Sequence, residues 1–321
     1  MKTLPINDGY FNIKSTDNEI FLSRFSVTKN GTCPQNCDLL EMNGVSYVIG
    51  HGKFDLNLDK TVNLLHRKLM IVNMCARFIK PKSKNDDGKK LLKDDFHVYI
   101  TVPPVMYEAM SDKMPNLLVG EYKVKHNGRE KQINIKKITV VPETYLVLGN
   151  HNKTDKYKNK TLIILDIGGL TSNLVKVTNG MFAFDEESYI TLDAGMYNID
   201  QKIASLFMGK GYPLDVLEIK LARDCGELID ESGKINLWDE CKDDIQEIYN
   251  DHFENLITAM RSKKWNFRTA EFLVTGGGGM TLFDTAKTFF PKAELSEDWM
   301  FDNIRGLEEA MDDEEEEDDV V

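Results

Sequence analysis

Two aspartates stand where apolar segments end, and glycine follows each within two residues. Asp8-Gly9 comes after the segment TLPIN, and Asp166 comes after LIIL and before Ile167-Gly168-Gly169. Each turn leads into another strand-like segment, so the order strand, acid, glycine, strand occurs twice along the chain. Glycines let backbone N–H groups face phosphate oxygens, and a neighbouring acid can hold a magnesium-bound water. The repeat predicts a paired phosphate clamp, although Asn-Asp-Gly alone is an ordinary hairpin turn.

Three other parts of the sequence have residue types and positions that suit phosphate or nucleotide binding. Lys14, on the return segment of the first turn, could neutralise phosphate charge. Glu143 follows the strand-like KITVV and Pro142, where a carboxylate could orient a water; a surface glutamate is the alternative. Gly276 to Gly279 lies between the apolar FLVT and a helical segment, which favours a nucleotide contact over a flexible joint. It is neither a P-loop nor G-x-G-x-x-G, because no Gly-Lys-Ser/Thr follows and Thr281 takes the third glycine's place.

The composition is that of a globular chain with a sizeable core. The 321 residues are 41% hydrophobic, which suggests two domains or two lobes. There is no apolar run of 18 residues and no leader-like N-terminus, so we expect no membrane span and a cytoplasmic location. The five cysteines are an odd number, and CxxxC at Cys33 and Cys37 lacks a second pair for a zinc site, so reduced thiols are expected.

The net charge of −12 is concentrated at the C-terminus. Residues 312–319 are eight consecutive acids, so the rest of the chain carries −12 − (−8) = −4. This balance argues against a broad nucleic-acid-binding face. The acidic run reads as a disordered, solvating end, with a docking site for a basic partner as the alternative.

Hydrophobic periodicity supplies the elements that would position these residues. Residues 3 to 27 and Thr161 to Val177 read as strands, and KITVV and EFLVT as two more. A helix is predicted from about Leu58, because apolar residues repeat at three- and four-residue steps; the predicted core stripe is Val62, Leu65, Leu69, Val72, Ala76 and Ile79. Further helices are predicted at Asp193 to Phe207, Asp215 to Arg223, Trp238 to Arg261 and Thr281 to Phe289. Strands and helices alternate in both halves, which predicts an α/β class.

In this order and spacing, the segments resemble the actin-like ATPases, and within them the plasmid-segregation proteins of the ParM type. The string D-G-x-x-N-I-K and the V-x-P-E-like segment favour the ParM branch. The segments that match phosphate 1, connect 1, phosphate 2, the adenosine motif and connect 2 are Asp8 to Lys14, Val141 to Glu143, Asp166 to Thr171, Gly276 to Gly279 and Phe301 to Ala310. The resemblance implies an actin-like fold of two RNase-H-like α/β domains that flank a nucleotide cleft. The domains would be residues 1–160, residues 161–300, and a C-terminal segment 301–321 in which a helix returns to the first domain before the acidic tail.

The resemblance also implies residue roles. Glu143 would activate or orient the lytic water, Asp166 would assist it, and Asp8 and Asp166 would hold Mg²⁺ through water. Gly195 would match a glycine turn that starts a helix near the nucleotide, and Lys220 or Arg223 would line the base pocket. The expected contacts to ATP or GTP are Asp8, Gly9, Asn12, Lys14, Gly168, Gly169, Leu170, Thr171, Gly195, Lys220, Arg223, Gly276, Gly277, Gly278 and Gly279.

Three departures from the family pattern fall on the phosphate turns. Tyr10 and Phe11 stand where small or hydroxyl residues are usual, so only backbone donors remain there. Leu170 replaces a frequent threonine, which leaves Thr171 as the hydroxyl, and Asn173 replaces a frequent aspartate. These changes put the hydrolysis rate and the choice between ATP and GTP in question.

The function that the resemblance implies is a filament-forming ATPase or GTPase that segregates plasmid DNA. Nucleoside triphosphate with Mg²⁺ would favour a homopolymer, hydrolysis would favour its disassembly, and DNA would be reached through a DNA-binding adaptor of a partition system rather than directly. One alternative is a small-molecule kinase of the same superfamily, for which 321 residues leave little room. Another is a nucleotide-binding scaffold with little hydrolysis.

Overall fold

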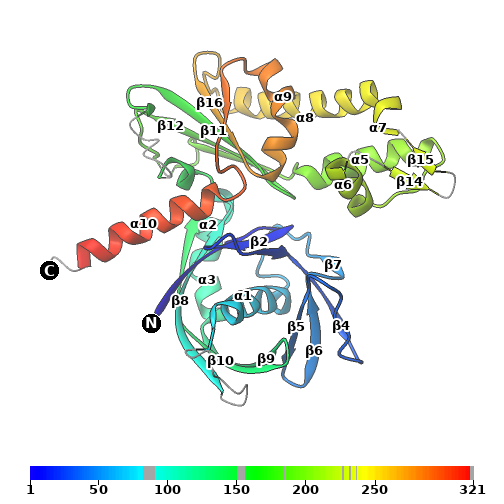
Figure 1. The fold of residues 1–321 in the computed structure, drawn as a ribbon. Helices are drawn as coiled ribbons and strands as arrows, with labels where there is room; N and C mark the ends of the chain where they lie inside the picture. Colours follow the sequence, from blue (N-terminus) through cyan, green and yellow to red (C-terminus); the bar gives the residue numbers. More distant parts are fainter. Residues whose placement is uncertain are drawn as a thin grey trace. The chain divides into compact units, whose positions relative to one another are not determined.

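The computed structural model describes residues 1–81, 91–149, 156–183, 185–225, 228–230, 233–235 and 237–318. The chain forms two compact units, one of Met1–Lys156 with Phe301–Val321 and the other of Tyr157–Met300. Figure 1 labels their helices and strands. Among the described helices, none combines the length and the apolar content needed to cross a bilayer.

The first unit is built on a ten-stranded mixed sheet in the spatial order β3-β2-β1-β8-β10-β9-β5-β6-β4-β7. Its strands are β1 (Lys2–Asp8), β2 (Asn12–Ser15), β3 (Ile20–Leu22), β4 (Arg24–Thr28), β5 (Asp38–Met42), β6 (Val45–Ile49), β7 (Lys53–Phe54), β8 (Leu92–Val102), β9 (Gly120–His126) and β10 (Arg129–Pro142). The sheet curves around helix α1 (Leu64–Phe78), as Figure 1 shows. Apolar residues of the strands and of α1 form the main core of this unit.

Helix α1 begins later than the periodicity predicts. Val62 and Leu65 are 66% and 43% exposed, so their assignment to the core stripe was wrong. The physical reason is local capping: the Asp59 carboxylate accepts hydrogen bonds from the N–H and hydroxyl of Thr61, and the Asn63 side chain accepts from the backbone N–H of residue 66. These side chains compete with helical hydrogen bonds, so residues 59 to 63 form a turn before the helix.

A buried aspartate ties α1 to the start of β5. Asp38 accepts hydrogen bonds from Asn73 (2.9 Å), Arg77 (2.7 Å) and Asn127 (2.8 Å), and the His126 ring nitrogen lies 3.6 Å away. Burial opposes ionisation of Asp38, but these partners outweigh it and hold its pKa well below the usual range. The carboxylate is therefore part of the structural core of this unit.

The remaining helices of the first unit cover the sheet or follow its strands. They are η1 (Pro104–Met106), α2 (Tyr107–Ser111), α3 (Lys113–Leu118), η2 (Tyr145–Leu148) and α10 (Asp302–Asp318). Leu307 of α10 packs with Leu146 and Tyr99. α10 runs on into the acidic segment that was predicted to be disordered, in agreement with the high helix propensity of glutamate.

The second unit is built on a five-stranded sheet in the order β13-β12-β11-β16-β17. Its strands are β11 (Thr161–Ile167), β12 (Ser172–Thr178), β13 (Tyr189–Leu192), β16 (Glu271–Thr275) and β17 (Ala293–Leu295), with β14 (Leu228–Asp230) and β15 (Gly233–Ile235) in a separate hairpin. Its helices are α5 (Met196–Gly209), α6 (Val216–Cys225), α7 (Leu237–Glu240), α8 (Lys242–Ser262) and α9 (Gly277–Phe289). The helix predicted from Trp238 to Arg261 is thus divided at Cys241, and three of the four glycines predicted as a turn are the first helical residues of α9.

The two units share one order of five strands. Three antiparallel strands are followed by two parallel ones, as β3-β2-β1-β8-β10 in the first unit and as β13-β12-β11-β16-β17 in the second. The central strand of each set ends near its aspartate, where Asp8 pairs with Ile13 and Asp166 with Asn173 across the hairpin. The α/β class is confirmed, and the two acid-glycine turns occupy equivalent places in the five-strand order that the two sheets share.

Candidate functional site

The first hairpin joins β1 to β2 and carries Asp8 at its start. Gly9 sits so close to the return strand that a Cβ there would lie 2.5 Å from the backbone oxygen of Asn12. A larger residue at position 9 would push the two strands of the hairpin apart. The Tyr10 hydroxyl donates to the backbone oxygen of Leu58 at 2.8 Å, which fastens the turn to the loop before α1. Lys14 lies farther along β2 and is partly buried.

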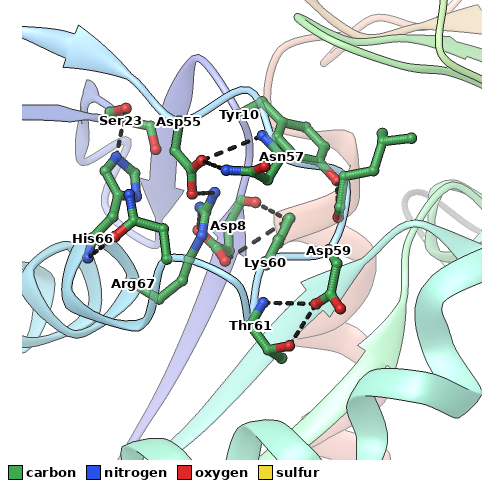
Figure 2. Close-up of polar contacts among 12 residues, drawn as sticks. Asp8, Tyr10, Ser23, Asp55, Asn57, Asp59, Lys60, Thr61, His66 and Arg67 are labelled. Atoms are coloured by element: carbon green, nitrogen blue, oxygen red, sulfur yellow. Dashed lines mark hydrogen bonds and ion pairs between the residues drawn. The ribbon is translucent and has the colours of Figure 1, made fainter.

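Two buried cations surround the Asp8 carboxylate, and Figure 2 shows them pointing toward it. Nη1 of Arg67 lies 2.7 Å from Oδ1 of Asp8, and Nζ of Lys60 lies 3.7 Å from Oδ2. Lys60 also donates to the backbone oxygen of Asp8 and lies over the Tyr10 ring, 4.8 Å from its centroid. Nη2 of Arg67 reaches Asp55 at 3.4 Å. Asp8, Lys60 and Arg67 are all 0% exposed, so the charges of this cluster are shielded from bulk solvent.

The protonation states of this cluster follow from burial and charge. Burial alone would raise the pKa of Asp8, but the charges of Arg67 and Lys60 outweigh it and lower that pKa. Burial lowers the pKa of Lys60, against the opposing charges of Asp8 and Glu143. Burial and the Glu143 charge raise the pKa of the Tyr10 phenol. Asp8 is therefore a carboxylate at neutral pH, and Glu143 belongs to the same electrostatic environment.

Glu143 comes directly after β10, as the sequence predicted for an acid at a strand end. Its backbone N–H donates to the Val102 oxygen at the end of β8 at 2.8 Å. The residue is 8% exposed, which does not fit the alternative of an ordinary surface glutamate. The next residue, Thr144, has a positive φ of 75°.

The second hairpin joins β11 to β12 through Gly168, Gly169, Leu170 and Thr171. The N–H of Gly168 donates to the Thr171 oxygen at 2.8 Å and closes the turn. Leu170, in the place of the family's frequent threonine, is only 4% exposed and so packs inward. Asn173 is also buried and accepts a hydrogen bond from the Thr191 hydroxyl at 2.8 Å.

The start of α5 binds the carbonyl side of this second hairpin. The backbone N–H groups of Gly195, Met196 and Tyr197 donate to the oxygens of Leu170, Gly168 and Gly169, at 2.7, 3.1 and 2.7 Å. A Cβ at Gly195 would lie 2.5 Å from the Leu170 carbonyl carbon, so this close approach requires glycine. Carbonyl oxygens repel phosphate, and an anion-binding turn needs them directed elsewhere. The contact with α5 provides that arrangement.

The glycine run from Gly276 to Gly279 lies against Asp166 and the start of α5 in the second unit. Gly276 has a φ of +83°, and a Cβ there would lie 2.4 Å from Oδ1 of Asp166. A Cβ at Gly278 would lie 2.6 Å from both Ile167 and Met196. The structure therefore brings together Asp166, the α5 start and the N-terminus of α9, three features that are far apart in the sequence.

The two residues proposed for the base pocket lie on α6. Arg223 forms an ion pair with the buried carboxylate of Asp200 on α5. This contact gives Arg223 a structural role in joining the two helices. Lys220 is partly buried on the same helix.

Sequence reasoning missed Lys60, Arg67 and Asp55. Lys60 and Arg67 are 52 and 59 residues from Asp8, in a segment read as the start of an amphipathic helix. No local signal marked Arg67, because it lies two residues from both Leu65 and Leu69 and so falls on the opposite face of the predicted helix, where a charged residue is expected.

Magnesium is implied by the resemblance, and the carboxylate oxygen atoms of Asp8 fit an ion that is held through water. Oδ2 of Asp8 receives no hydrogen bond from the described residues, so it can accept one from a water ligand. Direct coordination would set the ion against two buried cations. Three-residue clusters of metal-ligating side chains do not occur in the described ranges, but Mg²⁺ usually takes only one or two carboxylates together with phosphate oxygens.

Comparison with known proteins shows the fold. No protein-family model matches the chain, and no curated protein sequence does. Among solved structures, it is similar to a ParM in a 15-stranded filament from Clostridium botulinum, with 21% identity, a TM-score of 0.72 and coverage of 95% of this chain and 97% of that one. It is also similar to the archaeal actin homologue Ta0583 in complex with ADP, with 15% identity, a TM-score of 0.74 and coverage of 98% and 100%. A third is the actin-like protein Alp7A, with 14% identity, a TM-score of 0.72 and coverage of 99% and 97%. The chain has an actin-like fold.

Proposed function

We propose that this protein binds ATP or GTP with Mg²⁺, hydrolyses it, and couples the hydrolysis to assembly and disassembly of a homopolymer. The observation that carries the proposal is the pair of acid-glycine hairpins at equivalent places in the five-strand order that the two sheets share. The similar structures support it, since one is a filament and another is a complex with ADP.

The residue roles follow from the chemistry of phosphoryl transfer, in which positioning and charge stabilisation dominate. Glu143 would accept a hydrogen bond from the attacking water, and Asp166 would help to orient it. The backbone of the turns at Gly9 and Gly168-Gly169 would contact the phosphates, with Lys14 neutralising charge. Gly276 to Gly279 would contact the adenosine or guanosine end.

Magnesium would be held by Asp8 and Asp166 through its water ligands, and when bound it neutralises phosphate charge. Lys60 and Arg67 would maintain Asp8 as a carboxylate in a fixed orientation. This arrangement needs no serine or threonine on the first turn, which agrees with Tyr10 and Phe11 at that place.

The cellular role that we propose is plasmid segregation in the cytoplasm, with a DNA-binding adaptor as partner. The charge supports an adaptor, because the chain has a net charge of −12 and direct binding to a polyanion would be repulsive. Filament formation would require only that the triphosphate bind the polymer-competent state more tightly than the other state.

Two observations support a second candidate, a nucleotide-binding scaffold with little hydrolysis. Leu170 packs inward where a hydroxyl is frequent, and the Asp8 carboxylate is already neutralised by two cations. Both features would weaken the contacts that accelerate hydrolysis while sparing nucleotide binding.

Phosphate release and nucleotide binding, measured separately, distinguish the two candidates. Purified protein is given ATP or GTP with Mg²⁺ or with EDTA, and Glu143→Gln is compared with Glu130→Gln, which alters an exposed glutamate. The hydrolase predicts magnesium-dependent release that falls by about 100-fold or more in Glu143→Gln and is unchanged in the control. Tight binding without release would establish the scaffold, and the absence of binding to either nucleotide would refute both.

A further inference from the structure

The backbone immediately after Glu143 is strained. Thr144 has φ 75° and ψ −52°, and the N–H of Tyr145 donates to the Glu143 oxygen at 3.0 Å. These values define a three-residue γ-turn of the rare type with positive φ. A β-branched residue is especially unsuited to positive φ, so the surrounding structure must impose this conformation.

Helix α10 imposes the conformation from one side. Oδ1 of Asn303 accepts a hydrogen bond from the Thr144 N–H at 2.7 Å, across 159 residues of sequence. One turn later, Gly306 touches the backbone of η2, where an added Cβ would overlap the Leu146 oxygen at 1.7 Å. From the other side, β8 binds the Glu143 N–H through the Val102 oxygen at 2.8 Å. The Glu143 backbone is thus fixed between β8 and α10.

The same end of α10 also reaches the first hairpin and the turn that follows it. The Lys14 ammonium lies 6.0 Å from the centroid of the Phe301 ring, one residue before the helix. Nη2 of Arg305 donates to Oδ1 of Asn18, in the turn between β2 and β3, at 2.7 Å. The first helical turn of α10 therefore connects the predicted phosphate-binding hairpin with the predicted water-orienting glutamate.

We propose that Asn303 is a positioning residue for hydrolysis, which holds the strained turn at Thr144 and thereby directs the Glu143 carboxylate. The inference rests on the proposed function, because it assigns to Glu143 a role in orienting the attacking water. Strain at this position has a cost in stability, and it persists where a specific backbone direction is required. Asn303 does not touch the reacting groups; it acts through the Thr144 amide.

Three substitutions on α10 test the hydrogen bond itself. Asn303→Ala removes the acceptor, Asn303→Asp retains an oxygen in the same place, and Arg305→Ala removes a different contact of the same helix. Misplacement of a catalytic group by about 1 Å costs up to roughly 100-fold in rate. We expect Asn303→Ala to lower kcat by about 10- to 100-fold with nucleotide affinity unchanged, and Asn303→Asp and Arg305→Ala to stay within about twofold of wild type.

Two further measurements separate positioning from general stabilisation. Hydrogen exchange at the Thr144 amide should accelerate in Asn303→Ala and not in Arg305→Ala, whether or not nucleotide is present. Thr144→Gly adopts positive φ without steric cost and keeps the amide that Asn303 binds, so we expect its kcat to stay within about twofold of wild type. A loss of kcat in Asn303→Ala that is absent from Thr144→Gly is an outcome that a merely structural role of the Thr144 side chain does not produce.

The outcomes that overturn the role of Asn303 differ from those that overturn the proposed hydrolysis. Wild-type kcat in Asn303→Ala, or failure of Asn303→Asp to restore it, overturns the positioning role and leaves the proposed function intact. Equal losses of melting temperature and of kcat in Asn303→Ala and Thr144→Gly overturn it as well. If the wild-type protein binds nucleotide and releases no phosphate, the proposed hydrolysis fails, and the role of Asn303 in it fails with it.

Discussion

Replacing Arg67 with methionine tests whether the buried ion cluster holds the first hairpin. Both Arg67 and Asp8 are 0% exposed, and their closest atoms are 2.7 Å apart. Removing one partner of a buried ion pair costs about 3–5 kcal/mol, because the remaining charge stays buried. Asp55 also loses its contact with Arg67, while Lys60 remains near Asp8. We therefore expect Arg67→Met to lower the free energy of unfolding by about 3–5 kcal/mol.

Urea denaturation measured by two signals reports this loss. The three tryptophans, Trp238, Trp265 and Trp299, all lie in the second unit, so their fluorescence follows that unit and far-ultraviolet circular dichroism follows both. Lys68→Met, on the next residue of α1, is the matched control, with an expected change within about 0.5 kcal/mol.

A double-mutant cycle separates the ion pair from simple packing. Asp8→Asn and Arg67→Met should each destabilise the protein, and the double variant should lose less than the sum of the two by about 0.5–3 kcal/mol. A loss below about 1 kcal/mol in Arg67→Met, or strict additivity in the cycle, would refute the view that Arg67 compensates the buried charge of Asp8.

Three other substitutions test backbone and charge. Gly276→Ala should lower the melting temperature by several degrees, because its φ is +83° and a Cβ has no room, whereas Gly277→Ala, with nothing within 4 Å, should not lower it. The pKa of Asp38 is lower in the folded protein than in the unfolded chain, where it is about 3.9. The carboxylate therefore stabilises the fold above that pH, and this stabilisation is lost as the pH falls below it. The difference in unfolding free energy between wild type and Asp38→Asn should shrink between about pH 5 and pH 2 in urea titrations. Gly306→Ala should cost roughly 1–3 kcal/mol by chemical denaturation, because an added methyl group overlaps the Leu146 backbone.

Local sequence signals predicted the α/β class and the parts of the site that lie within one turn. Asp8-Gly9 and Asp166 with its glycines were found because an acid and a glycine after an apolar strand are adjacent in sequence. Burial of Glu143 agrees with its predicted position at the end of a strand. A continuous apolar run is a strong strand signal where both faces of a strand are covered, as in β11.

Contacts between residues far apart in the sequence could not be predicted from these local patterns. Lys60 reaches Asp8 only because the Asp59 and Asn63 side chains delay the start of α1, and such capping competes with the helical periodicity. The contact of Asn303 with Thr144 spans 159 residues, and no local pattern encodes it. The positive φ of Thr144 was equally hidden, since threonine ordinarily avoids that region.

Light scattering after addition of ATP or GTP with Mg²⁺, recorded together with phosphate release, shows whether the nucleotide drives assembly and hydrolysis reverses it. The wild-type protein should show a rise in scattering that decays as phosphate accumulates. In Glu143→Gln the rise should persist and little phosphate should appear, because the water is no longer activated. No rise at any protein concentration with either nucleotide would show that nucleotide does not drive assembly of this protein.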